Sequence, residues 1–223
     1  MAREAWRPIY NAMVRSVVIV FAKAAVPGRV KTRLIPALGP DLASRLHEAF
    51  VSDTLRALES LASSYDVEIH TDVPTAAWPE CAVRKLQSGG DLGQKMLAAL
   101  SGSLEEGRPA ALILGGDSPT LPMGYVAEAL ECPTDVCLGP CEDGGFYAIA
   151  CRRTDPEMFR HVVWSCAETR QQTMAAIERV GLTASLGPAW YDVDTGEDLS
   201  RLCVDPHLGP AVRMVLESAG LLT

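Results

Sequence analysis

An apolar stretch at residues 16–22 runs directly into a basic segment at residues 23–34, and this junction restricts the fold more than any other feature. Cations at the end of a buried strand must stay hydrated or meet an anion. Pro27 and Gly28 provide a turn, after which Lys31, Thr32 and Arg33 begin the next segment. Backbone N–H groups, a hydroxyl group and cations can therefore converge on phosphate. The alternative is a basic loop that is simply solvated.

The rest of the chain alternates between strand-like and helix-like stretches. Strands are predicted at residues 66–71, 82–86, 110–114, 135–138, 146–150 and 182–186, and helices at 40–61, 91–107, 125–130, 167–180, 197–203 and 209–219. Repeated strand–helix–strand units indicate an α/β fold, in which a mainly parallel, Rossmann-like sheet has helices on both faces and forms three layers. Ligands of such sheets bind at the carboxyl ends of the strands, where the basic segment lies.

Composition sets limits on the class of protein. The 223 residues fit one domain, which we expect over residues 16–223 after an N-terminal extension at 1–15. The net charge of −8 disfavours a general nucleic-acid binder, and no apolar run is long enough to cross a membrane. The extension lacks the pattern of a signal peptide. Seven cysteines without a Cys-x-x-Cys pair indicate reduced thiols and a cytoplasmic protein.

Two aspartates are candidate ligands for a divalent cation. Asp117 follows an apolar strand and a Gly-Gly pair, and Asp194 lies in a strand-like stretch beside Asp192. Mg²⁺ is typically held by one or two carboxylates together with phosphate oxygens and water. The alternative is that Asp117, and Asp194 or Thr195, cap the helices that follow them.

Three further features of the sequence each have two possible interpretations. Asp143, which precedes Gly144 and Gly145, is part of a turn or places a carboxylate beside a substrate. Trp164 stacks on a sugar or fills the core. The cysteines at 132, 137 and 141 are small buried residues or a metal or redox cluster.

Together these motifs resemble a small prokaryotic family described as glycosyltransferase-like or nucleotide-diphospho-sugar transferase-like, which has the GT-A fold. The resemblance extends over about residues 17–202 and rests on residues 21–23, 27–34, 90–93, 116–119, 139–140, 143–147, 164–165 and 192–195. It implies a nucleotide-binding core with a divalent metal, Mg²⁺ or Mn²⁺. Two positions depart from the pattern: Lys95 replaces a usual arginine, and Gly196 replaces a usual proline.

The resemblance also implies roles for individual residues. Lys31 and Arg33 contact a triphosphate, and Asp117 and Asp194 hold the metal. The predicted catalytic residues are Lys31, Arg33, Asp117 and Asp143, and the predicted acceptor-binding residues are Asp143, Gly144, Gly145 and Trp164. The predicted nucleotide-binding residues are Lys23, Pro27, Gly28, Arg29, Lys31, Thr32, Arg33, Gly90, Asp91, Gly93, Lys95 and Gly116. Asp91 also has the sequence context of a helix cap.

Three functions fit this pattern. The first is nucleotidyl transfer, in which a phosphorylated small-molecule acceptor attacks the α-phosphate of a nucleoside triphosphate and pyrophosphate leaves. It needs positioning and charge neutralisation more than a protein nucleophile. The second is glycosyl transfer from a nucleotide-sugar, with Asp143 as the base that deprotonates the acceptor. The third is a nucleotide-binding module without turnover. The sequence does not specify the base, the acceptor or the oligomeric state.

Overall fold

A seven-stranded sheet forms the centre of the computed structural model, which describes residues 14–222. Its spatial order is β3 (Val83–Leu86), β2 (Asp66–Thr71), β1 (Val17–Ala22), β4 (Ala111–Gly115), β6 (Phe146–Cys151), β5 (Val136–Pro140) and β7 (Ala184–Leu186). β6 runs antiparallel to β4 and β5, and the other neighbouring strands are parallel. The predicted mainly parallel sheet is therefore confirmed.

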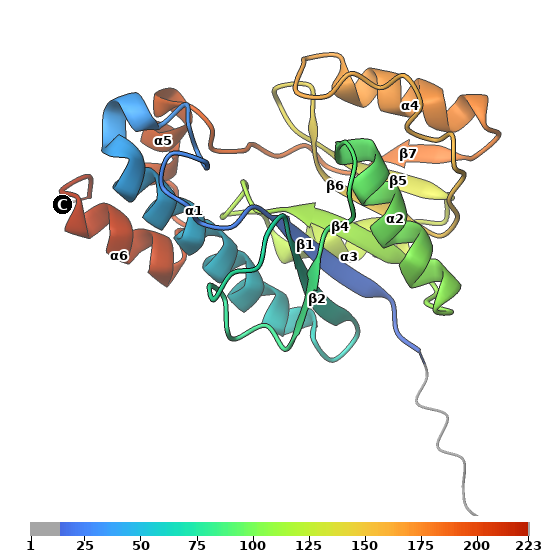
Figure 1. The fold of residues 1–223 in the computed structure, drawn as a ribbon, viewed down its shortest axis with the longest axis horizontal. Coiled ribbons are helices and arrows are strands. Elements are labelled where there is room, and N and C mark those ends of the chain that lie inside the picture. Colours follow the sequence, from blue (N-terminus) through green and yellow to red (C-terminus); the bar gives the residue numbers. More distant parts are fainter. Residues whose placement is uncertain (1–13, 223) are drawn as a thin grey trace, which may run out of the picture.

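Helices cover both faces of this sheet (Figure 1). Val18 and Val20 of β1 pack toward α1 (Ile35–Leu58) and α3 (Met123–Glu131). Val17 and Ile19 point to the opposite face, where α2 (Leu92–Glu105) and α4 (Thr169–Arg179) lie. Because successive side chains of a strand alternate between faces, one fully apolar strand supplies both cores. This gives the three layers that the sequence predicts.

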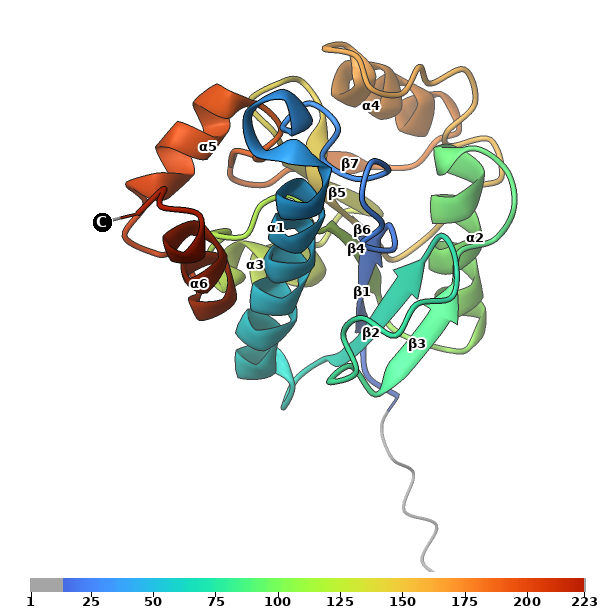
Figure 2. The ribbon, with the colours of Figure 1, turned by 60° about the vertical axis from the view of Figure 1, so that its left-hand side comes forward.

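Two C-terminal helices, α5 (Gly196–Cys203) and α6 (Pro210–Ser218), pack against the outer side of α1 (Figure 2). A buried carboxylate attaches α6 to α1: Asp53 accepts hydrogen bonds from the N–H groups of Ala211 and Val212 over 3.0 and 2.8 Å. A carboxylate at a helix N-terminus satisfies free N–H groups and interacts favourably with the helix dipole. Gly209 allows this approach, because a Cβ there would lie 2.3 Å from Asp53 Cγ.

Most differences from the predicted elements are small. α1 begins at Ile35 rather than at residue 40, but Gly39 (φ 74°, ψ 162°) interrupts it, so the regular helix starts at Pro40 as expected. A short 3₁₀ helix, Glu59–Leu61, follows it. Residues 192–195 are irregular instead of strand-like. Residues 1–13 of the predicted extension lie outside the described residues. Among the described helices, none combines the length and apolarity that a membrane span requires.

Candidate functional site

A cavity of about 740 Å³ opens at the carboxyl ends of β1 and β4, the edge predicted for a ligand. Apolar side chains of the sheet and of α2, such as Phe21 and Met96, line its floor, and the cations of residues 23–33 lie around it. Its lining includes Phe21, Lys23, Arg29, Lys31, Thr32, Arg33, His47, Asp72, Gln87, Leu92, Lys95, Met96, Gly116, Asp117, Phe146, Trp164, Ser165 and Asp194. This volume lies within the range typical of small-molecule sites.

The basic segment is held in place from two sides. Asp72, which follows β2, accepts a hydrogen bond from the Ala24 N–H over 2.7 Å and lies 3.7 Å from a guanidinium nitrogen of Arg29. On the other side, His47 Nε2 of α1 donates to the carbonyl oxygen of Lys23 over 2.9 Å. Burial lowers the pKa of His47, which favours its neutral form. Gly28 adopts a φ of 81° in the turn, a conformation that suits glycine. The segment is thus a fixed loop.

The ammonium group of Lys31 joins the basic segment to the acidic residues. Its nitrogen lies 2.5 Å from Asp117 Oδ1, 3.0 Å from Asp194 Oδ1 and 2.7 Å from the carbonyl oxygen of Val193. The Lys31 side chain is only 3% exposed, and its nitrogen lies 5.2 Å from the centre of the Phe50 ring. Burial favours the neutral amine, but the charges of Asp117 and Asp194 outweigh it and raise the pKa of Lys31. Lys31 is therefore charged at neutral pH.

Asp117 and Asp194 come from distant parts of the chain but share this cation. The Val193 N–H donates to the Asp117 carbonyl oxygen over 2.9 Å, which aligns the two segments. Neither aspartate is a helix cap. Pro122 precedes α3, and Thr195 caps α5 in a capping box with Asp198. Partial burial opposes ionisation of Asp117, whose side chain is half exposed, but the nearby Lys31 lowers its pKa overall, so the carboxylate stays ionised.

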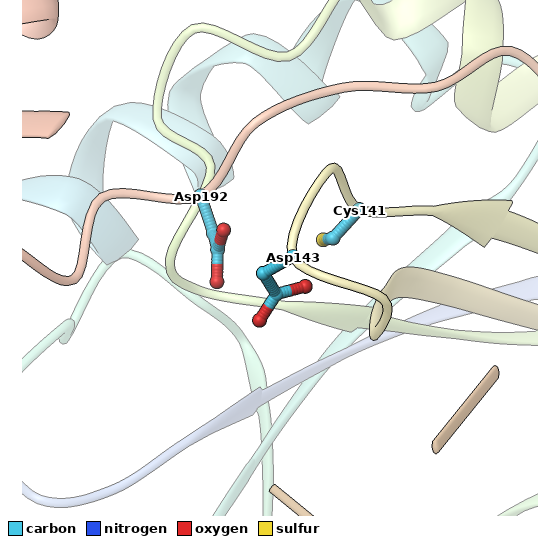
Figure 3. Close-up of side chains that lie close together, drawn as sticks. All are labelled: Cys141, Asp143 and Asp192. Atoms are coloured by element: carbon cyan, nitrogen blue, oxygen red, sulfur yellow. The ribbon is translucent and has the colours of Figure 1, made fainter. Parts of the chain in front are cut away.

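Cys141, Asp143 and Asp192 form a second group of side chains (Figure 3), close enough to Asp194 for its charge to act on Asp192. The ligand atoms of Cys141, Asp143 and Asp192 all lie within 4.8 Å of one another. Burial, together with the charges of Asp143 and Asp194, raises the pKa of Asp192 to about 6. Asp143 also accepts a hydrogen bond from the Gly145 N–H over 2.8 Å, so it is part of the predicted turn. Its carboxylate also lies beside Cys141 and Asp192. Within residues 14–222, Cys132, Cys137 and Cys141, for which a metal or redox cluster was one of two interpretations, do not form a common metal-binding group.

The cavity brings together ten of the predicted site residues: Lys23, Arg29, Lys31, Thr32, Arg33, Lys95, Gly116, Asp117, Trp164 and Asp194. Eight others do not line it: Pro27, Gly28, Gly90, Asp91, Gly93, Asp143, Gly144 and Gly145. Gly28 and Gly144 adopt positive φ angles in turns next to the cavity. Asp91 forms the predicted cap, because its side chain accepts a hydrogen bond from the Gln94 N–H over 2.9 Å.

Gly93 and Trp164 form one packing unit at the edge of the cavity. A Cβ at Gly93 would lie 2.8 Å from the Trp164 ring and 3.1 Å from Phe159 Cβ. The Trp164 ring packs edge-on against Phe146 and Phe159, with centroid distances of 6.4 and 5.8 Å. Trp164 therefore fills the core with part of its ring and lines the cavity as well. Gly93, the second glycine of the Gly-Asp-Leu-Gly motif, therefore has a packing role.

Sequence reasoning missed several residues of the site. Asp72 and His47 hold the basic segment, and Gln87 lines the cavity. Asp192, expected beside Asp194 in a strand-like stretch, faces Asp143. Asp72 had a usable signal, since it directly follows a predicted strand of the parallel sheet. His47 had none, because a single histidine on a helix does not indicate which loop it will contact.

Comparisons with known proteins agree with this architecture. Residues 57–166 match the family model "Uncharacterized protein conserved in bacteria (DUF2064)". One similar protein of known crystal structure comes from Desulfovibrio desulfuricans G20 and is provisionally assigned as a nucleotide-diphospho-sugar transferase. Its sequence is 30% identical to that of this chain. Its structure has a TM-score of 0.83, and the match covers 94% of this chain and 97% of that one. A comparison with curated proteins finds no match.

Two more distant structures share the fold. One is CMP:2-keto-3-deoxy-manno-octonic acid synthetase in complex with CTP, which is 12% identical and has a TM-score of 0.56; the match covers 91% of this chain and 99% of that one. The other is a cytidylyltransferase from Leptospira borgpetersenii serovar Hardjo-bovis, also 12% identical, with a TM-score of 0.52 and coverage of 94% and 97%. The chain belongs to the GT-A-fold nucleotide-diphospho-sugar transferase superfamily.

Proposed function

We propose that this protein is a metal-dependent transferase whose substrate is a nucleotide, and that its reaction is nucleotidyl transfer from a nucleoside triphosphate to a phosphorylated small molecule. The convergence of Lys31, Asp117 and Asp194 at one end of the sheet carries this proposal. The names of the similar proteins support the coarser part, a transferase that uses a nucleotide. The choice of nucleotidyl transfer rests on the number of cations around the cavity.

The donor set fits a hard divalent cation. Asp117 and Asp194 are close enough to share the positive charge of Lys31, and both carboxylates are partly exposed, at 49% and 36%. Carboxylate oxygens at a water-accessible edge suit Mg²⁺ or Mn²⁺, which keep several waters and phosphate oxygens as ligands. These two aspartates would hold the ion. When bound, it would neutralise charge at the α-phosphate and on the leaving pyrophosphate.

The chain's own residues supply binding and orientation. Arg29 and Arg33 are exposed at 61% and 67%, so their guanidinium groups are available for phosphate oxygens. Lys23 and Lys95 add positive charge at the cavity wall. The apolar floor, which includes Phe21 and Met96, fits a nucleoside and excludes water from it. Such positioning and charge neutralisation are sufficient for in-line displacement at phosphorus.

Glycosyl transfer from a nucleotide-sugar is the second candidate, and a specific observation favours it. Asp192 and Asp143 lie together beside the cavity, and the pKa of Asp192 is raised to about 6. A carboxylate with such a pKa is a better base near neutral pH than an ordinary aspartate, and glycosyl transfer needs a base for the acceptor hydroxyl group. In the reaction we favour, a phosphorylated acceptor attacks through an already ionised oxygen.

The reaction products distinguish the two candidates. The protein is incubated with Mg²⁺ or Mn²⁺, each common nucleoside triphosphate and a panel of sugar phosphates, and released pyrophosphate is measured. Parallel reactions contain nucleotide-sugars with simple acceptors, and released nucleoside diphosphate is measured. We expect metal-dependent pyrophosphate release. Nucleoside diphosphate release alone would support glycosyl transfer, and nucleotide binding without either product would support a binding module.

A further inference from the structure

Lys31 has no hydrogen-bonding capacity left for a substrate in this structure. An ammonium group has three N–H donors. Lys31 donates to the Val193 carbonyl oxygen and to Asp194 Oδ1 over 2.7 and 3.0 Å, and Asp117 Oδ1 lies 2.5 Å away as an ion-pair partner. With the side chain 3% exposed, a phosphate oxygen reaches this nitrogen only if one of these acceptors is given up. A direct phosphate contact by Lys31 therefore requires a rearrangement.

The same ammonium group occupies the place that a metal ion would need. It contacts Oδ1 of both aspartates, which are the two residues that we propose as ligands of the metal ion. Two positive groups cannot share these oxygens at such short range without strong repulsion. The Lys31 backbone is also held at a φ of 46°, which is uncommon for a residue with a side chain.

We propose that Lys31 is an internal counter-ion of the free protein, which holds Asp117 and Asp194 together and leaves them when a divalent cation binds. This inference rests on the proposed function, because it assigns the metal to these two aspartates. On leaving the carboxylates, the ammonium group has two free N–H donors, and phosphate oxygens are the acceptors that the substrate provides. Metal binding and phosphate binding are then coupled through one side chain, and the metal alone binds weakly.

The first test measures binding of Mn²⁺ alone to nucleotide-free protein, by the loss of the electron paramagnetic resonance signal of the free ion. Lys31→Met removes the competing charge while keeping an apolar chain of similar length. We expect this variant to bind Mn²⁺ roughly tenfold more tightly than the wild type, or better still, because a full positive charge has left the two carboxylates. Equal or weaker binding overturns the proposal.

Lys95→Met is the matched control. Lys95 lines the same cavity, but in the part of the chain that the structure describes it forms no ion pair with Asp117 or Asp194. Its removal also takes one positive charge from the cavity, and we expect a much smaller change in Mn²⁺ affinity. If both variants tighten Mn²⁺ binding equally, the effect comes from the overall charge of the cavity, and the specific role of Lys31 is refuted.

The second test uses only the wild type and does not depend on whether a variant folds. The protein is treated briefly with an amine-acylating reagent, and modification of each lysine is measured by mass spectrometry, with exposed Lys23 as the internal reference. We expect Lys31 to be protected in the free protein and to become at least several-fold more reactive when Mn²⁺ alone is added at a concentration that saturates the site. Lys31 as reactive as Lys23 without metal overturns the proposal.

The failure of this inference differs from a failure of the proposed function. If Mn²⁺ binds the wild type together with a nucleoside triphosphate, but Lys31→Met does not improve binding of Mn²⁺ alone, the metal site stands and the counter-ion role is wrong. If neither protein binds Mn²⁺ under any condition, the assignment of the metal to Asp117 and Asp194 is wrong, and this inference is wrong with it.

Discussion

The backbone N–H of Val193 donates a hydrogen bond to the carbonyl oxygen of Asp117 over 2.9 Å. This contact aligns the irregular segment after β7 with the end of β4, and it places the side chain of Asp194 beside that of Asp117. Two further bonds hold the same segment against the loop after β5: Trp190 N–H to Pro140 O, at 3.0 Å, and Glu142 N–H to Trp190 O, at 3.2 Å. Backbone contacts thus fix the acidic half of the site.

We expect Asp117→Asn to abolish metal-dependent turnover, with a loss of at least 100-fold, since an amide replaces a charged ligand of the cation. Far-ultraviolet circular dichroism and thermal melting should show an intact fold. The matched control is Asp41→Asn, which changes an exposed aspartate of α1. Turnover of Asp117→Asn close to that of the wild type would remove Asp117 from the metal site.

Arg29→Gln and Arg33→Gln should each weaken binding of a nucleoside triphosphate by about 10- to 150-fold, because one charge-assisted hydrogen bond to phosphate contributes roughly 1.5–3 kcal/mol. Binding of the nucleoside without phosphates should stay unchanged. Isothermal titration calorimetry measures both affinities, and Arg213→Gln, which changes an exposed arginine of α6, is the control. If both variants lose nucleoside and triphosphate affinity equally, these arginines act on the fold of the loop instead of on phosphate.

Gly93→Ala should destabilise the protein by about 1–3 kcal/mol, because the new methyl group would overlap the Trp164 ring. Gly102→Ala is a matched control in the same helix: a Cβ there meets no atom within 4 Å, so helix propensity alone should make it neutral or stabilising by up to about 1 kcal/mol. Urea unfolding gives both values. Equal stability of the two variants would contradict the packing of Gly93 against Trp164.

Stability should fall in acid because of Glu68. This side chain is 3% exposed and accepts hydrogen bonds from His70 Nε2, at 3.0 Å, and Arg108 Nη2, at 3.4 Å; Lys85 Nζ also lies 3.0 Å away. The His70 bond and the Lys85 charge outweigh burial and lower the pKa of Glu68 from 4.5 to about 2. A pKa lowered by folding gives stability that is present above about pH 4.5 and is lost as the pH falls toward 2, on the order of 3 kcal/mol.

Urea unfolding of the wild type and of Glu68→Gln at a series of pH values checks this prediction. The stability difference between the two proteins should be largest near neutral pH and should shrink as the pH falls from about 5 to 2. A difference that stays constant over this range would show that the ionisation of Glu68 does not contribute.

The sequence predicts the fold well because hydrophobic periodicity is strong in this chain. The apolar residues of β1 and β4 mark central strands, and the helices follow with boundaries within a few residues, except where Gly39 divides α1. The exception after β7 is instructive. Residues 192–195 alternate buried and partly exposed side chains as a strand does, but they do not pair with a strand. Instead, the Val193 N–H donates a hydrogen bond to the loop after β4.

The site is predictable in part. Lys31, Asp117 and Asp194 lie together as expected. Lys31 and Asp117 follow β1 and β4, whose ends share one edge of the sheet, and the hydrogen bond from Val193 to Asp117 brings Asp194 beside them. Contacts between side chains and distant backbone groups were not predictable. The hydrogen bonds of Asp72 to Ala24 and of His47 to Lys23 depend on how two elements pack, and no local pattern encodes them. For the same reason, the sequence did not show that the hydrogen bonds of Lys31 are taken up by protein oxygens.

Thermal melting of the wild-type protein with nucleotides tests the central claim most directly. Each common nucleoside triphosphate and nucleotide-sugar is added with Mg²⁺ or Mn²⁺, and again with a chelator. A ligand at one hundred times its Kd stabilises by about 2.7 kcal/mol, which for a chain of this length raises the Tm by roughly 5–10 °C. We predict such a shift for at least one nucleoside triphosphate with metal, and a smaller shift with chelator. No shift with any nucleotide under any metal condition would contradict the account.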